Sequence, residues 1–426
     1  MSAFGDKKVI SWAFYDWANS AFATIVMSGF FPLFLKQYWA ASHTSSETTF
    51  YLGAANSFAS LVVVVLAPIL GSIADRGGAK KRYLMFFAVM AIVMTGALSL
   101  VEEGNWVVAV SLYVIAVIGF SGGNVFYDAL IVSVADERKL DRISALGFSL
   151  GYLGGGLLFA LNVMMTLWPE SFGLADSTQA IRLSFLMVAA WWAIFSVPLL
   201  LFVREPVIID KISGWSSIAA GFGQLVATFH ELRQLRTVIL MLLAYWLYID
   251  GVHTIQRMAV DYGMALGFDY QDLIVAMLVS LFVGFPATIA FGRIGERLGA
   301  RTGIYIGIVV YIGISTWAAT INNVWEFYAL AIAIGLVQGG VQSLSRSLFA
   351  RIIPADRAGE FFGFYNMLGK FSAVLGPVMM GITSLATGDP RITILLPIVL
   401  FIAGGVILSL VNEREGMRHA RAMERK

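Results

Sequence analysis

The sequence predicts an all-α membrane protein in which twelve transmembrane helices form two pseudo-symmetric bundles of six. Three observations lead to this fold class. First, 58% of the 426 residues are hydrophobic and only 13% are charged, which leaves too little polar surface for a soluble protein of this length. Second, apolar segments recur along the whole chain, and each is close to or longer than the ~20 residues that a bilayer requires. Third, one short polar motif occurs once in each half, which indicates an internal duplication.

The apolar segments divide into two sets of six. In the first half they lie at roughly residues 11–38, 50–72, 83–101, 105–134, 143–167 and 181–203. In the second half they lie at roughly residues 237–262, 271–293, 302–320, 324–352, 360–386 and 391–411. We therefore expect an N-terminal bundle, a linker, and a C-terminal bundle with a short basic tail, over residues 1–203, 204–236 and 237–426.

The linker carries apolar residues at helical spacing, among them Trp215, Phe222 and Phe229, with polar residues mostly off that stripe. This pattern predicts an amphipathic helix. Two placements are open for it. The helix lies on the cytoplasmic membrane surface, or it packs beneath the bundles as a brace.

The repeated polar motif marks a tight turn at one membrane face. In the first half it spans residues 71–82 and is defined by Gly71, Asp75, Arg76, Gly78, Lys80 and Arg82. A weaker copy spans residues 292–301 and retains Gly292, Glu296, Arg297 and Arg301. Because glycine permits φ > 0 and close approach of neighbouring helices, each copy should form a tight connection after the second helix of its bundle.

Lysine and arginine residues gather on one side of the predicted membrane, where both chain termini also lie. The other side carries acids such as Glu47, Glu102 and Glu170. Because basic loops are retained in the cytoplasm, we expect a multi-pass protein of the cell inner (plasma) membrane with both termini cytoplasmic.

The composition argues against several classes of protein. The chain has no cysteine, so disulfides and thiolate metal sites are excluded, and no metal or cofactor is expected. The glycine-rich stretch 363–370 lacks the spacing and the Ser or Thr of a phosphate-binding loop. A membrane-embedded enzyme is an alternative, but the four histidines are scattered along the chain and no nucleophile converges with a base.

Polar side chains interrupt the apolar segments, and each ionisable one costs at least ~2.5 kcal/mol unless it has a partner or faces water. In the first and fourth spans the candidates are Tyr15, Asp16, Asn19, Asn124 and Asp128. In the seventh, tenth and eleventh spans they are Tyr245, Asp250, His253, Arg257, Gln338, Gln342, Arg346 and Lys370. Spans one, four, seven and ten hold most of these residues, which predicts a central polar cavity. The alternative is that the charges pair within one bundle and only hold its helices together.

Two charged residues are placed for a contact between the halves. Asp128 and Arg346 lie at the same depth in equivalent helices, so we expect them to pair when the cytoplasmic side is closed and to part when it opens. Asp250 and His253, one helical turn apart, are candidates for handling a proton.

The motif at residues 71–82 resembles the signature loop of the major facilitator superfamily. Two further stretches, residues 15–24 and 339–354, resemble the vacuole-effluxer-like branch of that superfamily, the autophagy-related amino-acid effluxers. The resemblance implies the major facilitator fold and a secondary transporter that uses no ATP and rocks two bundles about a central site. It also implies a gating role for Asp75 and Arg76, in which the acid meets the positive end of the eleventh helix when the cytoplasmic side closes.

The candidate cavity combines both signs of charge with amides and aromatic rings. This mixture suits a zwitterion, whose carboxylate and ammonium need opposite partners to leave water. Because yeast members of the branch are associated with amino-acid efflux, the resemblance points to an amino acid or small peptide. The alternative within the same fold is a lipid or lysolipid flippase. The expected partners are the bilayer, the small solute and a proton, with the protein a monomer that binds no nucleic acid.

Overall fold

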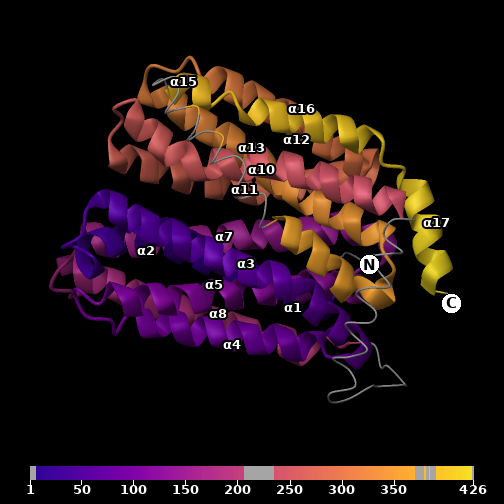
Figure 1. Ribbon diagram of the computed structural model, residues 1–426, viewed down its shortest axis with the longest axis horizontal. Helices are drawn as coiled ribbons and strands as arrows, with labels where there is room; N and C mark the ends of the chain where they lie inside the picture. Colours follow the sequence, from indigo (N-terminus) through magenta and orange to yellow (C-terminus); the bar gives the residue numbers. More distant parts are fainter. Residues whose placement is uncertain (1–5, 206–234, 370–378, 380–382, 384–389, 425–426) are drawn as a thin grey trace.

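The computed structural model describes residues 6–205, 235–369, 379, 383 and 390–424, and its regular structure in those ranges is entirely helical (Figure 1). Ten of the described segments are helices long and apolar enough to cross a membrane. The amphipathic helix predicted in the linker, Lys370, and most of the eleventh predicted span lie outside the described residues. The fold is that of a multi-pass, all-α membrane protein.

The first half begins with a continuous helical segment, Lys7–Trp39. It starts as α1 (Lys7–Ala21), widens to π-helical geometry over Phe22–Phe30, and passes through α2 (Phe31–Phe34) to a second π-helical stretch, Leu35–Trp39. The other helices are α3 (Ser45–Gly77), α4 (Lys80–Leu98), α5 (Trp106–Ala129), α6 (Ile131–Val134), α7 (Leu140–Leu167) and α8 (Ser177–Phe202). Apolar content predicted the first span but carried no signal for its π-helical geometry.

The second half repeats this order of long helices. It contains α10 (Arg236–Ala265), α11 (Tyr270–Leu298), α12 (Ala300–Ala318), α13 (Val324–Ile352), α15 (Pro390–Thr393) and α16 (Pro397–Ser409). Residues 358–369, at the start of the eleventh predicted span, are also helical.

The chain continues as a further helix, α17 (Glu413–Glu424), where the sequence analysis expected only a short basic tail. Gly416 and Ala420 are buried on its inner face, and Glu413 lies 3.2 Å from Arg351 at the end of α13. A helix of this length is marginal on its own, so these tertiary contacts stabilise it.

Local sequence signals set several helix ends. Thr44 and Glu47 form a capping box at the start of α3, and Asn323 and Glu326 form another at the start of α13. Gly78 ends α3 with φ 56° and ψ 43°, a left-handed conformation that glycine adopts without strain. The tight turn predicted within the first motif copy is therefore present.

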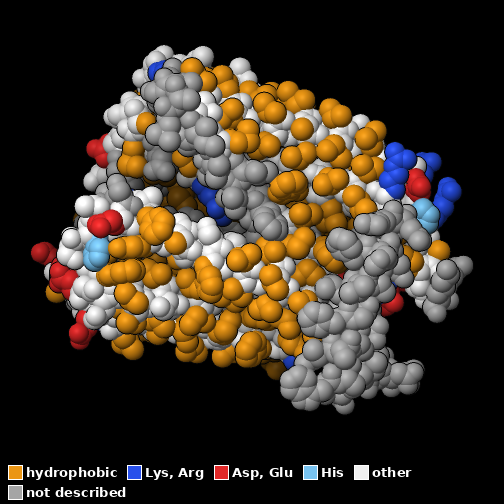
Figure 2. Space-filling model, viewed as in Figure 1, with side chains coloured by type: hydrophobic (Ala, Val, Ile, Leu, Met, Phe, Trp, Pro, Cys, Tyr) orange, Lys and Arg blue, Asp and Glu red, His pale blue; other side chains and the backbone are white. Residues whose placement is uncertain are grey.

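Figure 1 shows the helices of the first half together in one group and those of the second half in another. Within the first group α1 packs against α7 and α8, and α4 packs against α5. Within the second, α11 packs against α13, and α10 against α16. Between the groups, α7 packs against both α11 and α13. Apolar side chains cover much of the face seen in Figure 2, as lipid contact requires.

The two ends of the molecule carry opposite charge (Figure 2). The end that holds both chain termini and α17 is referred to as the basic end, and the opposite end, with exposed Glu47, Glu102 and Glu170, as the acidic end. Between the halves, nearer the acidic end, the surface in Figure 2 is hollowed, and Lys or Arg side chains lie inside the hollow.

Candidate functional site

At the basic end, the first motif copy contacts the opposite half. Asp75 lies in the last turn of α3. Its Oδ1 accepts a hydrogen bond from the Gly359 N–H at 2.9 Å, and its Oδ2 accepts one from the Glu360 N–H at 2.8 Å. Lys80 Nζ lies 2.7 Å from the same carboxylate. The acid thus binds the N–H groups that begin the helical segment 358–369, which is the contact that the family resemblance implies.

Close backbone approach makes this contact possible. A Cβ at Gly71 would overlap the carbonyl of Gly359, so only glycine fits there. Glu360 is buried beside Asp75, and Arg357 Nε donates to Glu360 Oε2 at 3.3 Å. The positive charge of Arg357 offsets the repulsion between the two acids.

The remaining basic residues of the first motif copy have different surroundings. The backbone N–H groups of Lys80 and Lys81 donate to the Glu205 carboxylate at 2.9 and 2.7 Å, so Glu205 caps the start of α4. Arg82 is exposed, and the side chain of Arg76 lies outside the description. Sequence reasoning missed Glu205 because it lies far along the chain, at the start of the linker.

The second motif copy makes a different set of contacts. Glu296 and Arg297 are exposed near the end of α11, and Gly292 packs against α7. Arg301 donates to two backbone carbonyl groups at the end of α16, at 3.0 and 2.8 Å. In the state described, Glu296, the acid of the second motif copy, faces solvent, whereas Asp75, the acid of the first copy, lies between the halves.

Deeper in the molecule, Arg346 of α13 meets two acids of the opposite half. Its Nη1 lies 3.0 Å from Asp128 Oδ1 on α5 and 3.6 Å from Asp16 Oδ2 on α1. Its Nε donates to Ser144 Oγ and its Nη2 to the Ser144 carbonyl, both at 2.9 Å. Only 2% of Arg346 is exposed. The ion pair predicted between Asp128 and Arg346 is confirmed; together with Asp16 and Ser144 it forms a set referred to as the Arg346 cluster.

Polar neighbours orient both acids of the Arg346 cluster. Tyr127 OH donates to Asp16 Oδ2 at 3.0 Å, and Asn366 Nδ2 donates to Asp128 Oδ2 at 3.0 Å. The alternative that these charges pair within one bundle is wrong here, because the cation comes from α13 and the acids from α1 and α5. The cluster therefore ties the two halves together inside the membrane-spanning region.

Three of the predicted amides take part in amide–amide hydrogen bonds, one such bond in each half. Asn19 Nδ2 donates to Asn124 Oδ1 at 2.6 Å, which joins α1 to α5. Gln256 Nε2 donates to Gln338 Oε1 at 2.7 Å, which joins α10 to α13. Each pair leaves further amide donors and acceptors that a polar solute can use.

A hydrogen bond between a tyrosine hydroxyl and a predicted amide crosses between the halves. Tyr152 OH on α7 donates to Gln342 Oε1 on α13 at 2.8 Å. Sequence reasoning missed Tyr152, Gln256 and Ser144 as site residues. Tyrosine, glutamine and serine carry no charge, so their presence in an apolar span is a much weaker signal than that of Asp or Arg.

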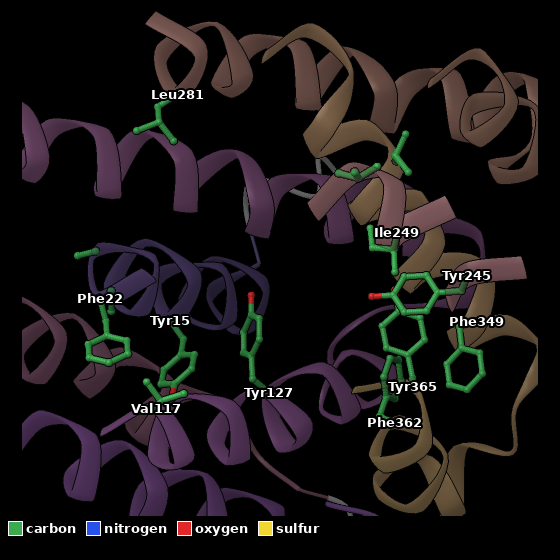
Figure 3. Packing of buried hydrophobic residues seen from close by; sticks show 14 of the residues in the cluster. Tyr15, Phe22, Val117, Tyr127, Tyr245, Ile249, Leu281, Phe349, Phe362 and Tyr365 are labelled. Atoms are coloured by element: carbon green, nitrogen blue, oxygen red, sulfur yellow. The ribbon is translucent and has the colours of Figure 1, made fainter. Parts of the chain in front are cut away.

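The predicted aromatic residues are part of the packed interior. Tyr15 is fully buried, with its ring centroid 5.1 Å from that of Tyr127, and Tyr245 stacks on Tyr365 at 4.0 Å. Figure 3 shows Tyr245 and Tyr365 in one group and Tyr15 and Tyr127 in another. In this state Tyr15 and Tyr245 contribute packing on either side of the region between the halves.

The predicted stripe on the seventh span lies on α10. Asp250 is fully buried and accepts a hydrogen bond from Thr254 Oγ1 at 3.4 Å. His253 is half-buried, whereas Arg257 is exposed although it lies inside the apolar segment Arg236–Val260. An ionisable side chain inside an apolar segment is by default a candidate functional residue, so Arg257 remains in the candidate set.

Among the residues that the structure describes, no three His, Asp or Glu side chains are grouped so as to hold a metal ion. What the described site offers is a set of charges, amides and hydroxyls near the contact between the halves. Such groups can bind, orient and release a polar solute.

Sequence relatives cover nearly the whole chain. A family model described as vacuole effluxer Atg22 like matches residues 43–140 and 132–421. The protein of Bacillus subtilis (strain 168) named as the uncharacterized MFS-type transporter YxiO is 38% identical over 409 residues, which cover 96% of this chain and 95% of that protein. Autophagy-related protein 22 of Yarrowia lipolytica is 24% identical over 86% of this chain and 76% of its own length.

Solved structures share the fold. The human organic anion transporter MFSD10 matches with a TM-score of 0.70 at 14% identity, covering 94% of this chain and 98% of that one. The proton:xylose symporter XylE matches with a TM-score of 0.70 at 14% identity, covering 98% and 97%. With the family match and the buried contacts between two helical halves, these likenesses lead to one conclusion. The chain is a multi-pass secondary transporter of the major facilitator superfamily and belongs to its Atg22-like vacuole effluxer family.

Proposed function

We propose that the protein moves a small polar solute, with an amino acid or small peptide favoured, across the inner (plasma) membrane by alternating access. The observation that carries this proposal is the Arg346 cluster, in which Arg346 of one half meets Asp16 and Asp128 of the other. Opposite charges on two bodies that move relative to one another can part and re-form, which is what a gate requires.

The moving bodies in this proposal are residues 1–203 and 237–426, joined by the linker 204–236. The packing of α7 against α11 and α13 supplies a surface about which they can rock. The basic end faces the cytoplasm, following the positive-inside rule. The contacts of Asp75 and Arg346 across the halves then correspond to a state closed toward the cytoplasm.

A zwitterionic solute fits the groups near this contact. Acids are present in the Arg346 cluster, and hydrogen-bonding amides in the pairs described above. We assign the solute's carboxylate to Arg257, an exposed residue within the apolar segment of α10, because a guanidinium can bind a carboxylate through two parallel hydrogen bonds. Asp250 is our candidate for carrying a coupled proton, since it is fully buried within α10.

Uptake into proteoliposomes tests the solute class. Labelled amino acids, short peptides, neutral sugars and lysolipids are offered to the purified protein, with protein-free liposomes as the baseline. We expect an amino acid or small peptide to accumulate and to compete with others of its class, and Asp250→Asn to change the dependence on a pH gradient. Transport of sugars or lysolipids without competition by any amino acid would contradict the zwitterion assignment and leave the transporter class intact.

A charge swap tests the gate. Removing one partner of a buried ion pair leaves an uncompensated charge that costs roughly 3–5 kcal/mol. We therefore expect Asp128→Arg and Arg346→Asp each to abolish uptake, and the double variant to recover part of it. A double variant no better than either single change would show that the pair does not form the gate.

A further inference from the structure

The guanidinium of Arg346 occupies a cage of aromatic rings. Its central carbon lies 4.3 Å from the ring centroid of Phe148, 4.9 Å from that of Trp12 and 5.4 Å from that of Tyr127. Ring faces at these distances attract a cation electrostatically, and cages of this kind bind the ammonium groups of ligands in other proteins. The three rings are referred to as the aromatic cage.

The aromatic cage belongs to one half and holds together without Arg346. Trp12 comes from α1, Tyr127 from α5 and Phe148 from α7. The rings of Trp12 and Tyr127 stack at 4.6 Å, and Trp12 Nε1 donates to the Tyr127 carbonyl at 3.0 Å. The acids beside the cage, Asp16 and Asp128, come from α1 and α5 of the same half.

The wall of the cage is closely fitted to its occupant. A Cβ at Gly147 would lie 2.8 Å from Tyr127 Oη, 2.9 Å from Asp16 Oδ2 and 3.0 Å from Arg346 Nη2. A glycine at this point of α7 lets the helix backbone approach the charged groups directly.

Arg346 comes from the other half, so its guanidinium can leave the aromatic cage when the halves move apart. Under the proposed function, opening the basic end withdraws α13 and with it the guanidinium. The first half then presents three ring faces and two carboxylates with no cation between them, an arrangement that attracts a cation from the water that enters. We propose that the vacated cage binds the cationic end of the transported solute, an ammonium or guanidinium group, and that Arg346 displaces it when the basic end closes.

This inference rests on the proposed function and names the part of the solute that is recognised. One positively charged group fits the cage at a time, because Arg346 fills the space between Asp16, Asp128 and the rings in the closed state. The arginine of the protein is therefore a built-in competitor that empties the site. Anionic and neutral groups are not ligands of this cage.

Thermal unfolding of a purified variant tests the inference directly. In Arg346→Ala the cage has lost its occupant, so methylguanidinium chloride should raise the unfolding midpoint by about 3–5 °C, relative to sodium chloride of equal strength, at a hundredfold excess over Kd. The wild-type protein should show no such gain. Adding Trp12→Leu to the variant should weaken methylguanidinium binding by about tenfold.

Arg351→Ala is the matched control. It removes another largely buried, ion-paired arginine of α13, which lies 2.5 Å from Asp141 outside the aromatic cage. An equal methylguanidinium effect in both variants would overturn the proposal. If Arg346→Ala fails to fold in sodium chloride, purification in methylguanidinium chloride gives the same readout: folding only with that cation supports the cage, and misfolding in both salts contradicts it.

The outcome is distinguishable from that of the uptake assay. Amino-acid uptake without binding of methylguanidinium to Arg346→Ala defeats the cage and leaves the proposed function standing. Binding of methylguanidinium without amino-acid uptake keeps the cage as a cation site and removes the proposed solute.

Discussion

The two motif copies lie at the same end of the molecule, yet only the first has its acid between the halves in this state. Asp75 binds the backbone N–H groups of Gly359 and Glu360. Glu296, the corresponding acid of the second copy, is exposed. Duplicated sequence has therefore not produced duplicated contacts.

At the interface near the second motif copy, the buried acid is Asp141 of α7, and it does not belong to the motif. Gly295 packs against Asp141 in the first turn of α7, where a Cβ at Gly295 would lie 2.9 Å from that of Asp141. Asp141 accepts hydrogen bonds from Ser347 Oγ and Arg351 Nη2 of α13, each at 2.5 Å. One interface thus uses an acid against a helix N-terminus, and the other an acid against side chains. The comparison teaches that the position of the acid can change while the contact between the halves is kept.

The largest effect is expected when the contact of Asp141 with the side chains of α13 is removed. Asp141→Ala removes one of the two acids that Arg351 pairs with among the described residues and leaves this largely buried arginine with Glu413, so we expect the free energy of unfolding to fall by roughly 3–5 kcal/mol. Denaturant unfolding in detergent measures the change. The exposed pair of Asp136 with Lys139, at 3.6 Å, supplies the control: Asp136→Ala should cost less than about 1 kcal/mol. Equal costs for the two variants would remove Asp141 from the comparison.

A smaller effect is expected when the contact of Asp75 with the backbone N–H groups of Gly359 and Glu360 is weakened. Asp75→Asn keeps the shape of the side chain but removes its charge and replaces one of the two acceptor oxygens by an NH2 group, which cannot accept a hydrogen bond. Hydrogen bonds to a charged group are worth about 1.5–3 kcal/mol each. We expect initial uptake rates to fall about tenfold or more, while the amount of folded protein changes little. Uptake at the wild-type rate would mean that this contact plays no part in the transport cycle.

The turn of the second copy should have a smaller effect on stability than Asp141→Ala. Gly299 has φ 88° and ψ 145°, a conformation essentially restricted to glycine, and a Cβ there would meet no atom within 4 Å. Gly299→Ala should therefore cost about 1–3 kcal/mol of folding free energy through backbone strain alone. Gly53→Ala, at an open position within α3, should instead stabilise the protein by up to about 1 kcal/mol. Denaturant midpoints compare the pair, and a loss at both positions would argue against backbone strain as the cause.

The smallest effect is expected at the acid that the second copy leaves exposed. Glu296→Gln should change the free energy of unfolding by no more than about 0.5 kcal/mol, because its side chain is exposed. Uptake should also be close to that of the wild type. A loss as large as that of Asp75→Asn would show that Glu296 gains a partner in another state of the cycle.

The sequence by itself determined the class of fold and the positions at which a charged side chain within a span has a high free-energy cost. The bilayer is a solvent that imposes local rules: spans must be apolar and helical, bases gather on one side, and an ionisable residue within a span demands a partner. Those rules were enough to place the first motif copy at its turn and to pair Asp128 with Arg346 from their shared depth.

Only the tertiary structure decided which helix faces meet. It brought Asp16 and Ser144 to Arg346, closed the cage of Trp12, Tyr127 and Phe148 around it, and left Glu296 in solvent. Helical spacing tells which residues share a face, but it does not tell which neighbour that face packs against. Aromatic and hydroxyl side chains occur on lipid-facing surfaces, in the packed core and in binding sites, so only the packing of the helices shows which role each one has.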